Sequence, residues 1–256
     1  TTNFTYSWNK NEIRELAANA VNPVTGEALN LTKLDIKGLG KAKYILKEGG
    51  TLGDLYTTSN LRFNDNGYVE VDKNGNLLMT DEGEDIYLGS VFPNHNLAWR
   101  NDFSYKGINL GVLFTARLGG VCYSATQANL DLYGVSEASA AARDAGGVLI
   151  NGREMVDAQK WYQAIGSQSG LPQYYLYSAT NVRLQELSLG YTFPRKWFRN
   201  KLGLTVSFVG RNLWMIYCKA PFDPEAVAST GLNYQGIDYF MMPSLRSLGF
   251  NVKFEF

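Results

Sequence analysis

Residues 248–256 alternate strictly between apolar and polar side chains. A period of two over this length predicts a β-strand with one apolar and one polar face. The apolar face holds only large side chains, and its last member is aromatic. These apolar residues are Leu248, Phe250, Val252, Phe254 and Phe256.

The same alternation recurs in earlier segments and predicts four further strands, at 97–105, 108–118, 182–193 and 202–213. Apolar residues at alternate positions near the start of the chain, from Phe4 to Trp8, suggest a sixth. Within 182–193 the apolar residues change parity at Gln185-Glu186. Such a slip indicates a β-bulge.

The connections between these strands alternate between two sizes. Residues 106–107 and 194–201 make short turns, whereas residues 10–94, 119–180 and 214–244 make long connections. Outer-membrane β-barrels are built in this way, with short periplasmic turns and long extracellular loops. If the short turns are periplasmic, the last strand runs downward and the C-terminus lies in the periplasm.

The long connections carry structure of their own. Ser136–Ala145 predicts a helix with a serine N-cap, ended by Gly146. Residues 156–165 predict a second helix, and residues 68–79 predict a hairpin that turns at Asn74-Gly75. Loops of this length with internal structure are usually functional.

Composition narrows the class of protein. The chain of 256 residues has 24 basic and 24 acidic side chains, and this balance argues against a nucleic-acid partner. No apolar run approaches the roughly 18 residues of a transmembrane helix, but a transmembrane strand needs only about 9–11. The N-terminus shows neither a signal peptide nor a starting methionine, so we expect a piece of a longer protein.

Several motifs, in a common order along nearly the whole chain, resemble those of the SusC/RagA-like TonB-dependent outer-membrane transporters of Bacteroidota. The closing strand at 248–256 is one of them. The others are Asn9-Lys10-Asn11, Asn101–Gly107, Leu184–Tyr191, Arg211-Asn212-Leu213 and Asp223-Pro224-Glu225.

The resemblance implies an all-β fold, an antiparallel transmembrane β-barrel segment. Residues 1–256 would form the C-terminal portion of the barrel, about six of some 22 strands, without the plug and the N-terminal strands. Residues 10–94, 119–180 and 214–244 would be outer loops. The terminal aromatic on an alternating strand resembles the signal that the outer-membrane assembly machinery reads, and we expect Phe254 and Phe256 to belong to it.

The function implied by the resemblance is TonB-dependent import of oligosaccharides or peptides across the outer membrane. The implied partners are a SusD-like surface lipoprotein, the TonB complex through the missing N-terminal part, outer-membrane lipid and the cargo. No cofactor, metal or nucleic acid is expected, and the protein is not expected to be an enzyme.

Aromatic residues gather in the connection at 119–180, at Trp161, Tyr162, Tyr174 and Tyr175. Their faces suit sugar rings or peptides, but they equally suit contact with a partner protein or packing within the loop. Trp8, Trp99, Trp197 and Trp214 lie near predicted strand ends and suit an interfacial girdle.

Arg100, Arg117 and Arg183 fall on the polar faces of their strands, which would point into the lumen of the barrel. Contact with the plug or with water is the simplest interpretation. Direct contact with the substrate is the alternative.

Catalytic and metal sites have little support in the sequence. His95 is the single histidine and has no matching serine motif. Asp72–Asn76 resembles the start of a calcium loop, but Gly83 stands where the last ligand belongs, so a hairpin turn explains it better. Cys122 and Cys218 could be bonded or remain free thiols.

Two other classes remain open from the sequence. A passive outer-membrane pore would lack an upstream plug. A soluble carbohydrate-binding β-sandwich would bury Phe250, Phe254 and Phe256 in a dry core between two sheets.

Overall fold

The computed structural model describes the chain except residues 18–19, 30, 81–82, 230 and 232–233. Its main element is a six-stranded sheet, here called the long sheet, in the order β1-β8-β9-β14-β15-β17. All neighbouring pairs are antiparallel, and the strands follow one another in sequence order. The strands are β1 Thr2–Trp8, β8 His95–Tyr105, β9 Ile108–Leu118, β14 Asn181–Phe193, β15 Gly203–Cys218 and β17 Ser247–Glu255.

The six predicted strands are therefore confirmed, and β15 is longer than predicted at its C-terminal end. The bulge is confirmed as well. The pairing of β14 with both of its neighbours shifts between Leu184 and Glu186, which leaves Gln185 without a register partner. The bulge restores one common side for the apolar residues that precede and follow it.

The strand register places the apolar faces of all six strands on one side of the long sheet. One row of paired residues crosses four strands through Leu110, Leu189, Phe208 and Phe250. The rings of Phe208 and Phe250 lie 5.5 Å apart, yet Phe250 is 80% exposed. This face is thus continuous and apolar, and no described element covers it, as expected for a surface in contact with hydrocarbon.

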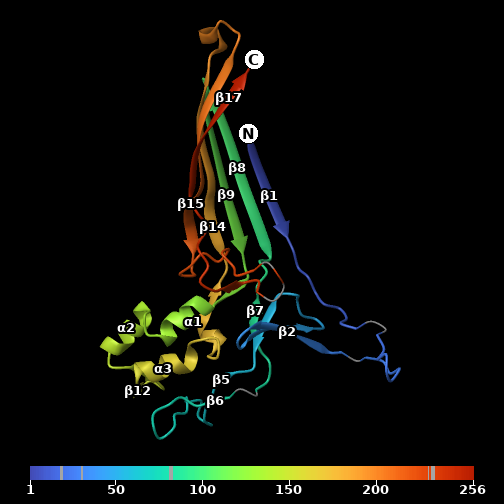
Figure 1. Cartoon of the computed structure of the whole chain (residues 1–256), viewed down its shortest axis with the longest axis vertical. Coiled ribbons are helices and arrows are strands. Elements are labelled where there is room, and N and C mark those ends of the chain that lie inside the picture. Colours follow the sequence, from blue (N-terminus) through green and yellow to red (C-terminus); the bar gives the residue numbers. More distant parts are fainter. Residues whose placement is uncertain (18–19, 30, 81–82, 230, 232–233) are drawn as a thin grey trace.

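The two ends of the long sheet differ. At the turn end, residues 106–107 join β8 to β9, and a turn with the 3₁₀ helix η2 (Arg195–Phe198) joins β14 to β15. At the opposite end, here called the loop end, the long connections fold into small sheets and helices (Figure 1). No described helix is long and apolar enough to span a membrane.

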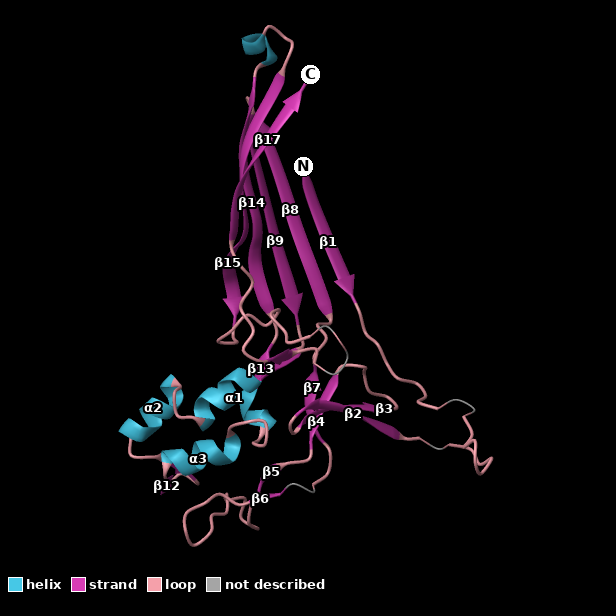
Figure 2. Cartoon of the chain, in the orientation of Figure 1, coloured by secondary structure: helices cyan, strands magenta, loops and turns pink. Residues whose placement is uncertain are grey.

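We call the folded part at the loop end the loop layer (Figure 2). It contains a four-stranded sheet, a three-stranded sheet, two small strand pairs and a helical part. The strands are β2 Lys33–Leu39, β3 Ala42–Lys47, β4 Asp54–Thr57, β5 Asn60–Leu61, β6 Met79–Thr80, β7 Ile86–Ser90, β10 Val121–Ser124, β11 Val148–Ile150, β12 Glu154–Val156, β13 Leu176–Ser178 and β16 Ile237–Asp238. The helices are α1 Ala125–Leu132, α2 Glu137–Asp144, α3 Ala158–Ile165 and the 3₁₀ helix η1 Pro172–Tyr175.

Two of the predicted local elements need correction. The helix α2 has the predicted Ser136 cap, whose side chain accepts a hydrogen bond from the Ser139 amide at 3.0 Å. Helix α3 begins at Ala158, two residues later than predicted, because Val156 pairs within a β-hairpin and Asp157 supplies the N-cap. The predicted hairpin at 68–79 is present, because Val71 pairs with Leu77 across the turn at Asn74-Gly75, but its last residue, Met79, pairs with Leu61 instead.

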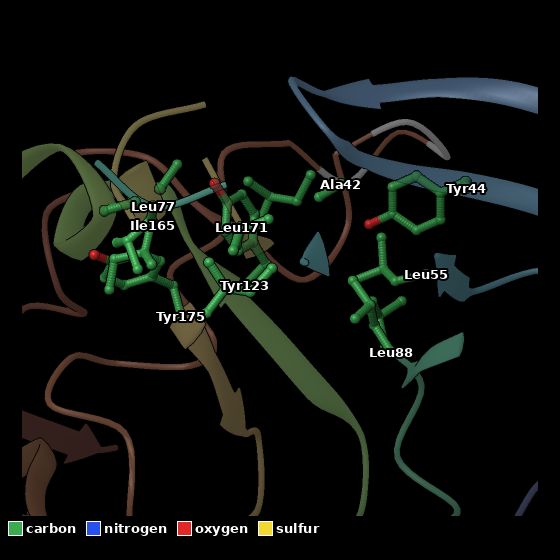
Figure 3. Close-up of a cluster of buried hydrophobic side chains, with 14 of the residues drawn as sticks. Ala42, Tyr44, Leu55, Leu77, Leu88, Tyr123, Ile165, Leu171 and Tyr175 are labelled. Carbon is green, nitrogen blue, oxygen red and sulfur yellow. The ribbon is translucent and has the colours of Figure 1, made fainter. Parts of the chain in front are cut away.

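The buried hydrophobic cluster of the chain lies in the loop layer, and all three long connections contribute to it (Figure 3). Leu55 comes from the first connection, Tyr123 and Leu171 come from the second, and Ile237 comes from the third; each is at most 1% exposed. The three connections therefore share one core and form a single packed body.

Candidate functional site at the junction of the long sheet and the loop layer

A buried ion pair joins the long sheet to the third long connection. Arg183 of β14 is 2% exposed, and two of its guanidinium nitrogens donate to the two carboxylate oxygens of Asp223. Its Nε also lies 3.6 Å from a carboxylate oxygen of Glu225. A bidentate contact of this kind fixes geometry as well as charge, because the planar guanidinium matches the carboxylate.

Asp223 is held on several sides. Its carboxylate accepts hydrogen bonds from the backbone amides of Glu225 at 3.0 Å and Ser244 at 3.1 Å. Burial alone would raise the pKa of Asp223, but the hydrogen bonds from Arg183, Ser244 and Glu225 outweigh it and lower this pKa to about 2. The carboxylate is consequently ionised across the ordinary pH range.

Acid is expected to loosen this junction. Because the pKa of Asp223 is lowered by folding, its contribution to stability is complete above the ordinary pKa of 3.8 and is lost as pH falls toward 2. The contribution at neutral pH is about 2 kcal/mol. Hydrogen exchange of the Glu225 and Ser244 amides, corrected for the intrinsic rate, should rise as pH falls from 5.5 to 3. Asp223→Asn should abolish that dependence, and an equal dependence in this variant would contradict the assignment.

A second side-chain contact fastens the same segment. Asn212 adopts a left-handed backbone conformation with φ 52°, which asparagine tolerates better than most residues. Its side-chain amide donates to the carbonyl of Ser244 at 2.9 Å, and its Oδ1 accepts from Arg183 at 3.4 Å. The motif residues around 211–213 and 223–225 thus meet in one network, which we call the junction network: Arg183, Asn212, Asp223, Glu225 and Ser244.

A pocket of about 270 Å³ opens beside the junction network. Its walls are mainly apolar, and Arg117 and Glu225 are among its lining residues. The Nη1 of Arg117 lies 3.9 Å from a Glu225 carboxylate oxygen, and the two side chains are 47% and 31% exposed. Such a loosely held pair leaves the charge of Arg117 accessible to a bound molecule, unlike the buried charges of Arg183 and Asp223. The apolar lining residues include Val91, Phe92, Pro93, Val121, Pro224 and Val227.

Charged side chains form a row across the polar face of the long sheet. Glu186 accepts from Arg100 at 3.3 Å and from Arg211 at 3.0 Å, and Arg100 also donates to Asp102 at 2.9 Å. Arg100, Glu186 and Arg211 lie in one register row across the sheet. The predicted arginines thus share the polar face, but Arg100 lies in this row whereas Arg117 and Arg183 lie at the loop end.

The four candidate ligand-binding aromatics divide into different environments. Tyr175 is 3% exposed, and its hydroxyl donates to Asp131 at 2.9 Å inside the core shown in Figure 3. The rings of Trp161 and Tyr174 meet edge to face at 5.8 Å, and Tyr174 is 42% exposed. Tyr162 borders a second pocket of about 300 Å³. Accessible aromatic surface is therefore offered by Tyr174 and Tyr162, whereas Tyr175 packs.

The remaining candidates lie apart from the junction. Phe254 and Phe256 are 56% and 99% exposed at the turn end. His95 is at the loop end of the apolar face, where its ring stacks on Tyr6 and its Nδ1 lies 2.9 Å from the Tyr6 hydroxyl. Cys122 and Cys218 are free thiols, and burial raises the pKa of Cys122 to about 12.

The antiparallel strands in sequence order, with one uncovered apolar face, define a segment of a transmembrane β-barrel. The alternative of a soluble β-sandwich is wrong, because Phe250, Phe254 and Phe256 are exposed rather than buried between sheets.

Comparison with known proteins shows which proteins this segment resembles. The chain is similar over 99% of its length to TonB-dependent receptor P3 of Formosa agariphila, at 25% identity. It shares its fold with the RagAB peptide transporter, with a TM-score of 0.57 at 19% identity, and with the RagAB peptide importer in the "open-open" state, with a TM-score of 0.57 at 18% identity. No family model matches the chain.

The predicted resemblance to part of a SusC/RagA-like TonB-dependent transporter is thus confirmed. The chain spans 26% of the length of each of these relatives, as a C-terminal part of the barrel would. The relatives are named as receptors and transporters rather than as enzymes.

Some residues of the site were not identifiable from the sequence. The sequence indicated Glu186 only as part of a β-bulge, whereas in the structure its carboxylate accepts hydrogen bonds from two arginines of other strands. Asp131 sits on a short helix whose pattern gave no sign of a buried carboxylate. Asp223 and Asn212 were noticed as motif residues only, because their shared contact with Arg183 depends on long-range pairing.

Proposed function

We propose that the chain is the C-terminal portion of a TonB-dependent outer-membrane importer for oligosaccharides or peptides. The observation that carries this proposal is the long sheet with one uncovered apolar face and a folded loop layer at one end. The resemblance to TonB-dependent transporters supports the same function. Energy would reach the barrel from the TonB complex through the plug, and the plug would belong to the remainder of the protein.

In this proposal the loop layer, built from the connections at 10–94, 119–180 and 214–244, faces outside the cell. The turn end and the C-terminus then face the periplasm. Arg100 and Arg117 point into the lumen, toward the plug or the cargo, and Tyr162 and Tyr174 offer ring surface to the ligand. Phe254 and Phe256 form part of the signal for barrel assembly.

The loop layer also offers an anchor for a SusD-like surface lipoprotein. The hairpin of β11 and β12 carries apolar residues on both faces. Ile150 and Val156 are about 5% exposed on the inner face, whereas Leu149 and Met155, a directly paired couple, are 58% and 51% exposed. Paired apolar residues at the surface of a folded hairpin suit burial at a protein interface.

The docking experiment replaces both exposed residues in the full-length transporter, as Leu149→Lys with Met155→Glu. We expect at least a tenfold loss of the lipoprotein that co-purifies, because apolar anchors dominate such interfaces. Uptake of fluorescent tryptic casein peptides and of labelled maltooligosaccharides by whole cells is measured in parallel. Whichever of these cargoes the wild type imports should be taken up less by cells that carry the variant.

A matched control makes the same chemical change at Val21 and Val24, which are 56% and 91% exposed, as Val21→Glu with Val24→Lys. This control variant should still co-purify with the lipoprotein and should take up the cargo as the wild type does. If the hairpin variant keeps its partner at full yield while uptake falls, the hairpin contacts cargo and the docking proposal is wrong. If deletion of the upstream plug leaves uptake of either cargo unchanged, the chain belongs to a passive pore.

A further inference from the structure

Positive charge is concentrated at the turn end of the long sheet. Residues 103–110 and 190–206, which contain the two turns, have no aspartate or glutamate. The cations there, together with one from β17, are Lys106, Arg195, Lys196, Arg199, Lys201 and Lys253.

One carboxylate side chain, Glu255, neutralises part of this charge. It lies 3.1 Å from Arg195 and 2.5 Å from Lys253. Within the described part of the chain, the side chains of Lys196, Arg199 and Lys201 make no ion pair, and all three residues are exposed. The 194–202 turn therefore carries three uncompensated positive charges, which we call the cationic turn: Lys196, Arg199 and Lys201.

The cationic turn has a defined backbone. The Asn200 amide donates to the Arg195 carbonyl at 3.0 Å, and the Lys201 amide donates to the Phe198 carbonyl at 3.1 Å. Arg199 and Asn200 take left-handed conformations that close the turn after η2. The charges are thus displayed on an ordered turn, which lowers the entropic cost of binding.

An exposed aromatic residue lies within the same turn. Trp197 is 62% exposed, and its ring lies 5.9 Å from that of Phe193. Phe193 pairs with Leu204, which in turn pairs with Phe254, so Trp197 continues the apolar face of the long sheet. Tryptophan beside the apolar band of a barrel occupies the boundary between hydrocarbon and headgroups. The unpaired cations at this boundary stand where lipid phosphates lie.

We propose that the cationic turn binds the headgroups of anionic phospholipids in the membrane leaflet at the turn end. Phosphate oxygens would accept from Lys196, Arg199 and Lys201, while Trp197 rests among the upper acyl chains. Charge complementarity and the adjoining apolar face favour a lipid over free phosphate or an acidic protein, which would leave Trp197 in water. The inference rests on the membrane embedding of the long sheet and is independent of the cargo.

The test measures lipid retained by the full-length transporter. The protein is incubated in mixed detergent micelles with equal amounts of phosphatidylglycerol and phosphatidylethanolamine, and bound lipid is quantified by mass spectrometry after purification. The wild type should retain phosphatidylglycerol preferentially. The triple variant Lys196→Gln, Arg199→Gln, Lys201→Gln should bind it at least about tenfold more weakly, since each cation near an anionic surface contributes to binding.

A matched control, Lys37→Gln with Lys73→Gln and Lys219→Gln, removes three exposed lysines from the opposite side of the chain and should leave lipid retention unchanged. The shift of the folded band on unheated gels shows whether each variant forms a barrel. If the triple variant does not fold, retention of phosphatidylglycerol by the wild type is measured from 50 to 500 mM NaCl instead. A contact that depends on charge must weaken as the salt concentration rises, so retention should fall.

Phosphatidylglycerol bound equally by the triple variant and the wild type would overturn the proposal. So would equal retention of the two lipids, or retention insensitive to salt. Competition by 50 mM inorganic phosphate that removes the lipid would show a free-anion site instead. A failure of cargo uptake with lipid binding intact would bear on the import function alone.

Discussion

Replacing Arg183 by glutamine is expected to loosen the residues around Asp223 and Ser244 from the end of the long sheet. The substitution leaves the Asp223 carboxylate, 7% exposed, without its guanidinium partner. Removing one member of a buried ion pair costs about 3–5 kcal/mol, because the remaining charge stays desolvated. Hydrogen exchange of the Glu225 and Ser244 amides, which Asp223 holds, should accelerate by at least about a hundredfold in the full-length protein.

Arg211→Gln provides the matched control. Arg211 also pairs with a carboxylate, Glu186, at 3.0 Å, but its side chain is 67% exposed. Exposed pairs contribute only about 0–1 kcal/mol, so this variant should leave the exchange pattern nearly unchanged. Adding Asp223→Asn to Arg183→Gln should recover part of the protection by removing the unpaired charge. Equal effects of Arg183→Gln and Arg211→Gln would show that the junction network does not hold this segment.

Placing arginine at position 250 is expected to impair insertion of the barrel strongly. Phe250 lies near the middle of β17 on the apolar face, opposite Phe208. A lysine or arginine at the lipid-facing midplane of a barrel costs about 2–4 kcal/mol. The folding free energy of the full-length protein in lipid vesicles, measured by denaturant titration, should fall by this amount, and less folded protein should accumulate in the outer membrane.

The neighbouring position supplies the control for this prediction. Asn251 points to the opposite face and pairs with Ser207, among polar side chains. Asn251→Arg should therefore be tolerated within about 1 kcal/mol, since substitutions on the lumen face tune selectivity more than stability. A greater loss for Asn251→Arg than for Phe250→Arg would show that the faces of the long sheet are assigned in reverse.

The strands of the long sheet could be predicted because each strand is indicated by the pattern of its own residues. Alternation with a period of two identifies each strand, and the parity change at Gln185-Glu186 identifies the bulge without any knowledge of its neighbours. The apolar residues of adjacent strands then had to share a side, because a slip of one residue would turn a whole strand over. The observed register satisfies this condition across all six strands.

The loop layer could be predicted only in fragments. Ser136 identified the cap of α2, and Asn74-Gly75 identified a turn, because both are short-range signals. The pairing of Met79 with Leu61 joins residues that are distant in sequence, and no periodicity encodes it. The contact of Arg183 with Asp223 has the same character, so the sequence placed Arg183 on the polar face without indicating its partner.

The shared core of the three long connections has a consequence for protein engineering and for evolutionary divergence. Leu55, Tyr123 and Ile237 come from different connections and belong to one buried cluster. If one connection alone were replaced by that of a homologous transporter, its core side chains would not match those of the other two connections. The mismatch would leave cavities or steric overlaps in the core. The three connections are therefore expected to change in concert, so that chimaeras designed to alter specificity must exchange all three together.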